Sequence, residues 1–242
     1  EEAINETDDM LTRYAYAKRG GDLTGETLAS KFVITAFGGG YDGTAENTNV
    51  EISGSPFLQN VFGGGLGSKV GAKQQNSSAA YASTVGTVNG GTNVNITGAT
   101  IYGNVYGGGA GIFGEIEATT AHGTARMPYY KAAMVMKETN LEISGGTLIF
   151  GNVYGGGDIA NTGWYEEGYR PSVSHQDYVN ESQAHLDLTT YLQMKGGNVM
   201  GNVFAGGNGR KMTELEKANF IGAIIGNTSV VLGNYNSSTS TW

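Results

Sequence analysis

The feature that most constrains the fold is a repeated motif that ends in glycines. The stretch GNVYGGG occupies Gly103–Gly109 and occurs again at Gly151–Gly157. Four longer segments align on it, and we call them copies one to four: Asn49–Gly65, Asn93–Gly109, Asn140–Gly157 and Tyr191–Gly207. A partial copy precedes them at Lys31–Gly40, and a weaker one follows at Thr228–Asn234. A unit this short cannot bury its apolar residues alone, so the copies are expected to stack on one another.

Each copy contains three short apolar pieces. The first alternates apolar and polar residues, as in Val50, Glu51 and Ile52 of copy one. A period of two predicts a β-strand with one buried face. A glycine follows as a turn in every copy, at Gly54, Gly98, Gly145 and Gly196. A second apolar piece and a third strand, Asn-Val-Phe or Asn-Val-Tyr, then lead into the glycines.

The spacing of the copies indicates the architecture. The glycine triplets begin at residues 38, 63, 107 and 155, with a variant, AGG, at 205, so the steps are 25, 44, 48 and 50 residues. The shortest step is a complete unit, and the longer ones contain the same unit plus an insert. A unit of about 25 residues with three short strands is the size of one coil of a parallel β-helix. The sequence therefore predicts an all-β chain, an elongated right-handed parallel β-helix (solenoid) with loop insertions.

In such a fold, equivalent residues of successive copies form columns. Two interior columns are predicted, Val50, Val94, Leu141 and Leu192 in one and Val61, Val105, Val153 and Val203 in the other. A column of stacked rings would contain Phe62, Tyr106, Tyr154 and Phe204. Asparagine tolerates left-handed backbone and bonds its own turn. A structural asparagine ladder is therefore expected at Asn60, Asn104, Asn152 and Asn202.

The main alternative fold is a kelch-like β-propeller. Its repeats run near 50 residues and carry a glycine pair after an apolar strand, as Phe37–Gly43 does. A step of 25 residues is too short for a four-stranded blade. The aromatic signature of kelch repeats is also not repeated here, since the only tryptophans are Trp164 and Trp242.

The domain boundaries follow from the repeat. Residues 1–30 precede it and are expected to cap the stack, with a short helix as one way of doing so. Residues 31–242 form the repeat region, with inserts near 66–92, 110–139, 158–190 and 208–227. The chain begins with EEAINETDD, without an initiator Met or a signal peptide, which is typical of a mature or excised piece of a longer protein.

Composition excludes several classes of function. The net charge is −8 and no run of Lys and Arg is present, so nucleic acid is not an expected partner. No apolar run approaches about 18 residues, so direct membrane insertion is not expected either. The chain has no cysteine, which excludes disulfides and cysteine-based metal sites.

Cofactor and metal motifs are weak. The glycine triplets follow strands as phosphate-binding loops do, but none ends in Gly-Lys-Ser/Thr. Asp42 and Asp158 follow glycines as in calcium-binding β-rolls, yet the nine-residue period of those proteins is missing. The histidines, His122, His175 and His185, stand singly. We therefore predict no cofactor, no metal site and no catalytic residue, with calcium on scattered carboxylates left open.

Two functional readings remain. In the third insert, aromatic residues lie among hydrogen-bonding groups and favour recognition of glycan or protein by Trp164, Tyr165, Tyr169, Arg170 and Tyr178. Alternatively, parallel β-helices host polysaccharide lyases and glycoside hydrolases, an analogy at the level of fold. Glu51 and Glu142 would then lie two copies apart, about 10 Å, near the upper limit for an inverting pair.

The repeated NVxIxG…GNVYGGG pattern resembles the glycine-rich β-helical repeats of large bacterial surface and adhesin-like proteins. The resemblance covers most of the chain and implies a secreted or cell-surface location. It also implies a structural or adhesive role. Together with the aromatic residues of the third insert, it leads us to expect a non-enzymatic scaffold that binds glycan or a host or bacterial surface protein through its inserts. It transfers no catalytic residue. A carbohydrate-active β-helix enzyme is the alternative function.

Overall fold

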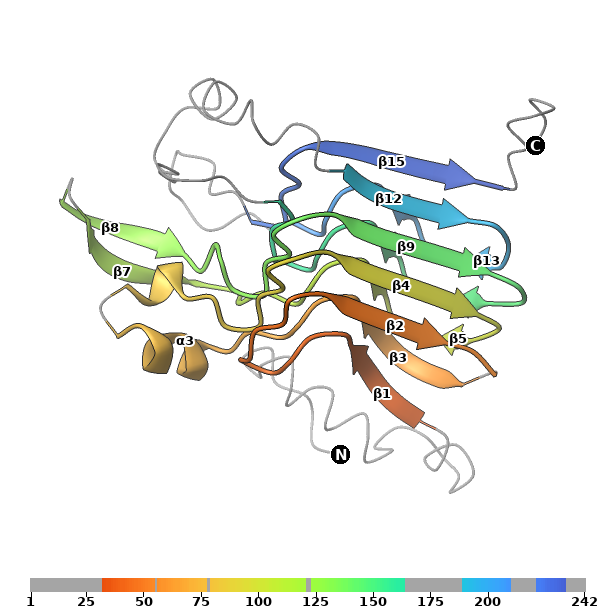
Figure 1. The fold of residues 1–242 in the computed structure, drawn as a ribbon, viewed down its shortest axis with the longest axis horizontal. Helices are drawn as coiled ribbons and strands as arrows, with labels where there is room; N and C mark the ends of the chain where they lie inside the picture. Colours follow the sequence, from red (N-terminus) through yellow and green to blue (C-terminus); the bar gives the residue numbers. More distant parts are fainter. Residues whose placement is uncertain are drawn as a thin grey trace.

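The structure is a computed structural model that describes residues 32–54, 56–77, 79–120, 123–163, 189–209 and 221–233. The N-terminal segment 1–30, predicted as a cap, lies outside the described residues. The described part is mainly β-structure, built from two parallel sheets and one antiparallel hairpin, with short helical segments in an insert (Figure 1). The all-β class with parallel pairing between copies is therefore established.

The first strand of every copy belongs to a five-stranded parallel sheet. Its order is β15-β12-β9-β4-β2, as Figure 1 shows. The strands are β2 (Thr48–Ile52), β4 (Thr92–Thr97), β9 (Thr139–Ser144), β12 (Thr189–Met194) and β15 (Asn227–Leu232). Val50 pairs in register with Val94, Val94 with Leu141, and Leu141 with Leu192. The first predicted interior column is confirmed.

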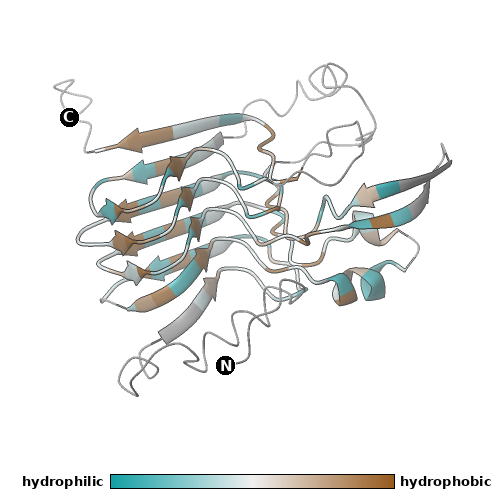
Figure 2. Cartoon of the chain, turned by 180° about the vertical axis from the view of Figure 1, so that it is seen from behind, coloured by the Kyte–Doolittle hydropathy of each residue, from teal (hydrophilic) through white to brown (hydrophobic). Residues whose placement is uncertain are grey.

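The second and third pieces of the copies form an eight-stranded parallel sheet. Its strands are β1 (Phe32–Phe37), β3 (Phe57–Phe62), β5 (Thr100–Ile101), β6 (Val105–Tyr106), β10 (Leu148–Ile149), β11 (Val153–Tyr154), β13 (Asn198–Val199) and β14 (Val203–Phe204). The pairs Val61–Val105, Val105–Val153 and Val153–Val203 confirm the second column. Both columns belong to one buried apolar cluster, and in Figure 2 the hydrophobic segments line up from strand to strand.

The predicted aromatic column is also confirmed, and it extends to Phe37. Successive rings from Phe37 through Phe62, Tyr106 and Tyr154 to Phe204 are nearly parallel, with centroids 4.6–5.0 Å apart. Phe62 and Tyr106 are almost fully buried. The hydroxyl of Tyr106 accepts a hydrogen bond from Nδ2 of Asn104 at 3.1 Å, so the phenol oxygen has a partner next to the stack.

The four asparagines link the copies one to the next. The side-chain oxygen of Asn60 accepts the backbone N–H of Asn104 at 2.8 Å, and that of Asn104 accepts the N–H of Asn152 at 2.7 Å. Asn152 accepts the N–H of Asn202 at 2.8 Å. Each amide thus bonds the backbone of the following copy, in a ladder that runs through all four copies.

A threonine column accompanies this ladder, and sequence analysis missed it. The hydroxyls of Thr48, Thr92 and Thr139 donate to the carbonyl oxygens of Gly63, Gly107 and Gly155 at 2.6–2.7 Å. The threonines are buried at the start of the first strand of copies one to three. They tie the five-stranded sheet to the glycine triplet of the same copy, a link that the recurring Thr-Asn pair would have indicated.

The first glycine of each triplet is required by close packing. A Cβ atom on Gly63 would overlap the carbonyl oxygen of Gly107, and one on Gly107 would overlap that of Gly155. These glycines do not adopt positive φ, so lack of space and not backbone angle requires glycine here. Positive φ occurs instead at the turn glycines of the copies, Gly54, Gly98, Gly145 and Gly197, and the last of these lies one residue after the predicted Gly196.

Substitution of Gly107 by alanine tests this packing. Because the new methyl group meets a carbonyl of the next copy, Gly107→Ala should lower the free energy of unfolding by about 3 kcal/mol. Gly146→Ala is the matched control, since nothing lies within 4 Å of its Cβ position. The control should change stability by less than about 0.5 kcal/mol. Urea unfolding followed by circular dichroism measures both, and equal stability of the two variants would contradict the packing argument.

The asparagine ladder gives a second prediction. Asn104→Ala leaves the N–H of Asn152 without its acceptor and should cost about 1–3 kcal/mol. Asn202→Ala is the control, because Asn202 lies at the end of the described ladder and is exposed. We expect that control to stay within about 0.5 kcal/mol of the parent. Urea unfolding followed by circular dichroism measures both variants. If Asn104→Ala left the free energy of unfolding unchanged, the ladder would not contribute to stability.

Candidate functional site

The glycine triplets are not free to receive a phosphate. The N–H groups of Gly63 and Gly64 donate to the carbonyl oxygens of Tyr106 and Gly108 at 2.9 and 3.0 Å. The triplets of the neighbouring copies are bonded in the same way. A phosphate cradle needs backbone N–H groups that point at the ligand. These groups instead hold one copy against the next.

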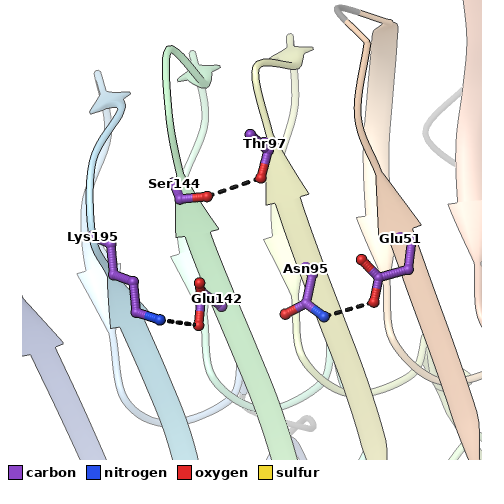
Figure 3. A network of polar contacts seen from close by, with 6 residues as sticks. All are labelled: Glu51, Asn95, Thr97, Glu142, Ser144 and Lys195. Carbon is purple, nitrogen blue, oxygen red and sulfur yellow. Dashed lines mark hydrogen bonds and ion pairs between the residues drawn. The ribbon is translucent and has the colours of Figure 1, made fainter.

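The outward positions of the five-stranded sheet form a polar face. Its side chains bond across neighbouring strands, as Figure 3 shows for six of them. Asn95 donates to Glu51 at 2.7 Å, Thr97 and Ser144 lie 2.9 Å apart, and Lys195 contacts Glu142 at 2.6 Å. The same pattern continues in a further pair, Asn93 to Asn49, at 2.7 Å.

Glu51 and Glu142 are the carboxylates considered for carbohydrate cleavage. They lie on β2 and β9, with Asn95 of β4 between them in register. Glu51 accepts a hydrogen bond from Asn95, whereas Glu142 pairs with Lys195 on its other side (Figure 3). The two carboxylates therefore have separate partners and lie on a strand face rather than across a groove.

The acidic residues named for calcium have structural partners. Asp42 accepts the backbone N–H and the hydroxyl of Ser68 at 2.6 and 2.5 Å, and Ser68 is the N-cap of α3 (Lys69–Gln75). Asp158 is buried and accepts a hydrogen bond from Asn208 at 2.8 Å. Among the described residues, no three His, Cys, Asp or Glu side chains are grouped to hold a metal ion.

The aromatic residues predicted to contact a ligand, Trp164, Tyr165, Tyr169, Arg170 and Tyr178, all lie outside the described residues. The first two inserts are described, and they pack together. We call residues 67–87 and 111–134 the insert pair. They lie between the bridges that join Leu66 to Ala110 and Val88 to Val135.

The insert pair has a small core of its own. The first insert contains α3 and the 3-10 turn η1 (Ala80–Ala82), and the second contains the hairpin of β7 (Glu115–Thr120) and β8 (Gly123–Pro128). Both inserts extend from the same side of the stack in Figures 1 and 2. Their buried residues form one cluster, which comprises Ala72, Ala80, Val85, Ile112, Tyr129 and Ala132.

Tyrosine and lysine side chains meet beside this core. The rings of Tyr81 and Tyr130 lie 6.2 Å apart, one from each insert, and Nζ of Lys131 lies 5.9 Å from the centroid of the Tyr130 ring. Burial, with the phenol of Tyr81 adding to it, raises the pKa of Tyr130 to about 12. Burial also lowers the pKa of Lys131. Sequence analysis missed this group, because the two inserts share no repeated motif that would have signalled their contact.

Comparisons with protein-family models, with curated proteins and with solved structures gave no match. Within the described parts of the chain, no helix combines the length and the apolar character that a membrane crossing requires. The geometry of the stack and of the insert pair is therefore the basis on which a function is proposed.

The shifted pKa of Tyr130 predicts an alkaline loss of stability. Its neutral phenol is favoured in the folded state, so the folded chain binds more protons than the unfolded chain between pH 10 and about 12. The free energy of unfolding should fall as pH rises through that window. Tyr130→Phe should reduce the slope, as measured by urea unfolding at several pH values. A slope unchanged in Tyr130→Phe would contradict the assignment.

Proposed function

We propose that the chain is a right-handed parallel β-helix whose role is to display its inserts. The support is the pairing of equivalent residues in successive copies at three places: the two parallel sheets and a third series of bridges. That series joins Ala45 to Val88, Val88 to Val135, Val135 to Thr162 and Thr162 to Ile224. A propeller fits less well, because its blades are separate four-stranded sheets, whereas both parallel sheets here continue through all copies.

The function that we infer is a non-enzymatic, adhesin-like scaffold at a bacterial cell surface or in the extracellular medium, which binds glycan or protein through its inserts. The observation that supports it is a difference between the repeated residues, which mainly stabilise the stack, and the residues of the insert pair, which extend from the side of the stack (Figure 1). Most repeated positions pack in the interior or form hydrogen bonds between copies, and the exposed rings of the copies, Tyr102 and Phe150, stack on each other. The insert pair, by contrast, forms a separate cluster that offers exposed side chains, among them Phe113 at 51% exposure.

The alternative is a carbohydrate-active enzyme that uses the polar face. Glu51 and Glu142 would have to act together there, and their separate hydrogen-bond partners argue for a solvated strand face instead. The scaffold is therefore the preferred proposal.

Removal of the hairpin tests the scaffold. Glu115 and Pro128 face each other at the base of the hairpin, so a two-residue Gly-Ser link can replace residues 115–128. The variant should keep the sheets and lose binding on a glycan array and to a panel of immobilised surface proteins. Glu142→Gln, on the polar face, is the control and should bind as the parent does.

The same preparations should be tested for polysaccharide degradation. Cleavage by the parent that is lost in Glu51→Gln or Glu142→Gln would favour the enzyme. Binding that survives removal of the hairpin would show that residues 115–128 are not the recognition element.

A further inference from the structure

The charge of the insert pair is opposite to that of the whole chain. The chain carries a net charge of −8. The insert pair contains four basic residues, Lys69, Lys73, Arg126 and Lys131, against Glu115 and Glu117, which gives it a net charge of +2. These basic residues are separated in sequence, so no charged run marks them. The packing of the two inserts gathers them into one part of the molecule.

The exposed surface of the insert pair is more basic than this count indicates. Lys69 and Lys73 lie on exposed positions of α3, and the side chain of Arg126 is 65% exposed. The Glu115 side chain is only 3% exposed and pairs with Arg126 at 3.4 Å. Among the described residues of the insert pair, Glu117 is the one acidic side chain on the surface. Asp42, outside the insert pair, also lies at the N-cap of α3, where its carboxylate accepts hydrogen bonds from Ser68. The insert pair itself therefore offers an anion more cations than carboxylates.

Aromatic rings accompany these cations. Phe113 precedes Gly114, and Nζ of Lys69 lies beside Gly114, close to where a Cβ atom would stand. The second insert thus places an exposed ring near an ammonium group of the first. Tyr81, Lys131 and the buried Tyr130 form a second group of rings and a cation, and Tyr130 and Lys131 follow β8 at the same base of the hairpin. Rings offer an apolar surface to the carbon-bound hydrogens of a sugar, and cations pair with carboxylate or sulfate.

We propose that the insert pair binds an acidic polysaccharide, whose sugar rings carry carboxylate or sulfate groups. This inference rests on the proposed function and names the ligand class of the same surface. Lys69 and Lys73 attract the anionic groups, and Phe113 packs against a sugar ring. Because the contacts are exposed, affinity should fall as the salt concentration rises. The acidic remainder of the chain disfavours a densely charged polymer such as DNA.

The test measures binding of the whole chain to four polymers by biolayer interferometry. The probes are alginate, chondroitin sulfate, neutral dextran and a single-stranded DNA oligonucleotide. We expect binding to alginate or chondroitin sulfate, weakened by salt, and no binding to dextran. The double variant Lys69→Gln with Lys73→Gln should lose about tenfold in affinity. It leaves the Glu115–Arg126 pair intact, so its fold should be unchanged by circular dichroism.

Two further variants complete the test. Lys195→Gln removes one charge from the polar face and should bind as the parent does. Phe113→Leu should weaken binding of the acidic polysaccharide with no change in its salt dependence, because it removes a ring and no charge.

The outcomes separate this inference from the proposed function. Equal binding of dextran, tighter binding of DNA, no binding of either acidic polymer, or unchanged affinity of the double lysine variant would overturn the acidic ligand. If removal of residues 115–128 still abolished binding of a neutral glycan or a protein, the proposed scaffold function would be supported and only the acidic ligand would be wrong. If no binding depended on the inserts, both proposals would fail.

Discussion

The stack depends on one close contact between backbones. The carbonyl oxygen of Gly63 accepts the hydroxyl of Thr48 and lies where a side chain on Gly38 would have to be. The same arrangement recurs at Gly107 and at Gly155. Only glycine leaves room for a carbonyl at this separation. The distance between copies, and with it the pairing of strands, rings and asparagines, follows from that contact.

Much of this stack could be predicted from the sequence. A period of two and a common alignment were enough to place Val94 and Val105 in interior columns and Tyr106 in a stack of rings, because equivalent residues must meet when identical units pair in register. The threonine column was missed, since the aligned segments began one residue too late to include Thr92. The close packing at Gly107 was missed for a different reason. Sequence shows that a position requires glycine, but not whether backbone angle or lack of space imposes the requirement.

The candidate site was much harder to predict. Contact between the inserts depends on the stacking that brings residues about 45 positions apart to neighbouring places, and no motif in the inserts records it. The lysines of α3 and the ring of Phe113 are unremarkable until the fold puts them near one another. The aromatic residues that the sequence did single out, from Trp164 to Tyr178, lie outside the described residues, so their role stays a prediction.

Ala205 occupies the position that is glycine in the three preceding copies. Its carbonyl oxygen packs against Gly155, as the others do, while its methyl group would point to where a following copy would stack. The glycine requirement therefore has a direction: it applies to a residue only where the carbonyl oxygen of a following strand packs against it. Gene duplication could lengthen such an array from within without any other change. A further strand paired with β14 in the same register would first require Ala205 to become glycine.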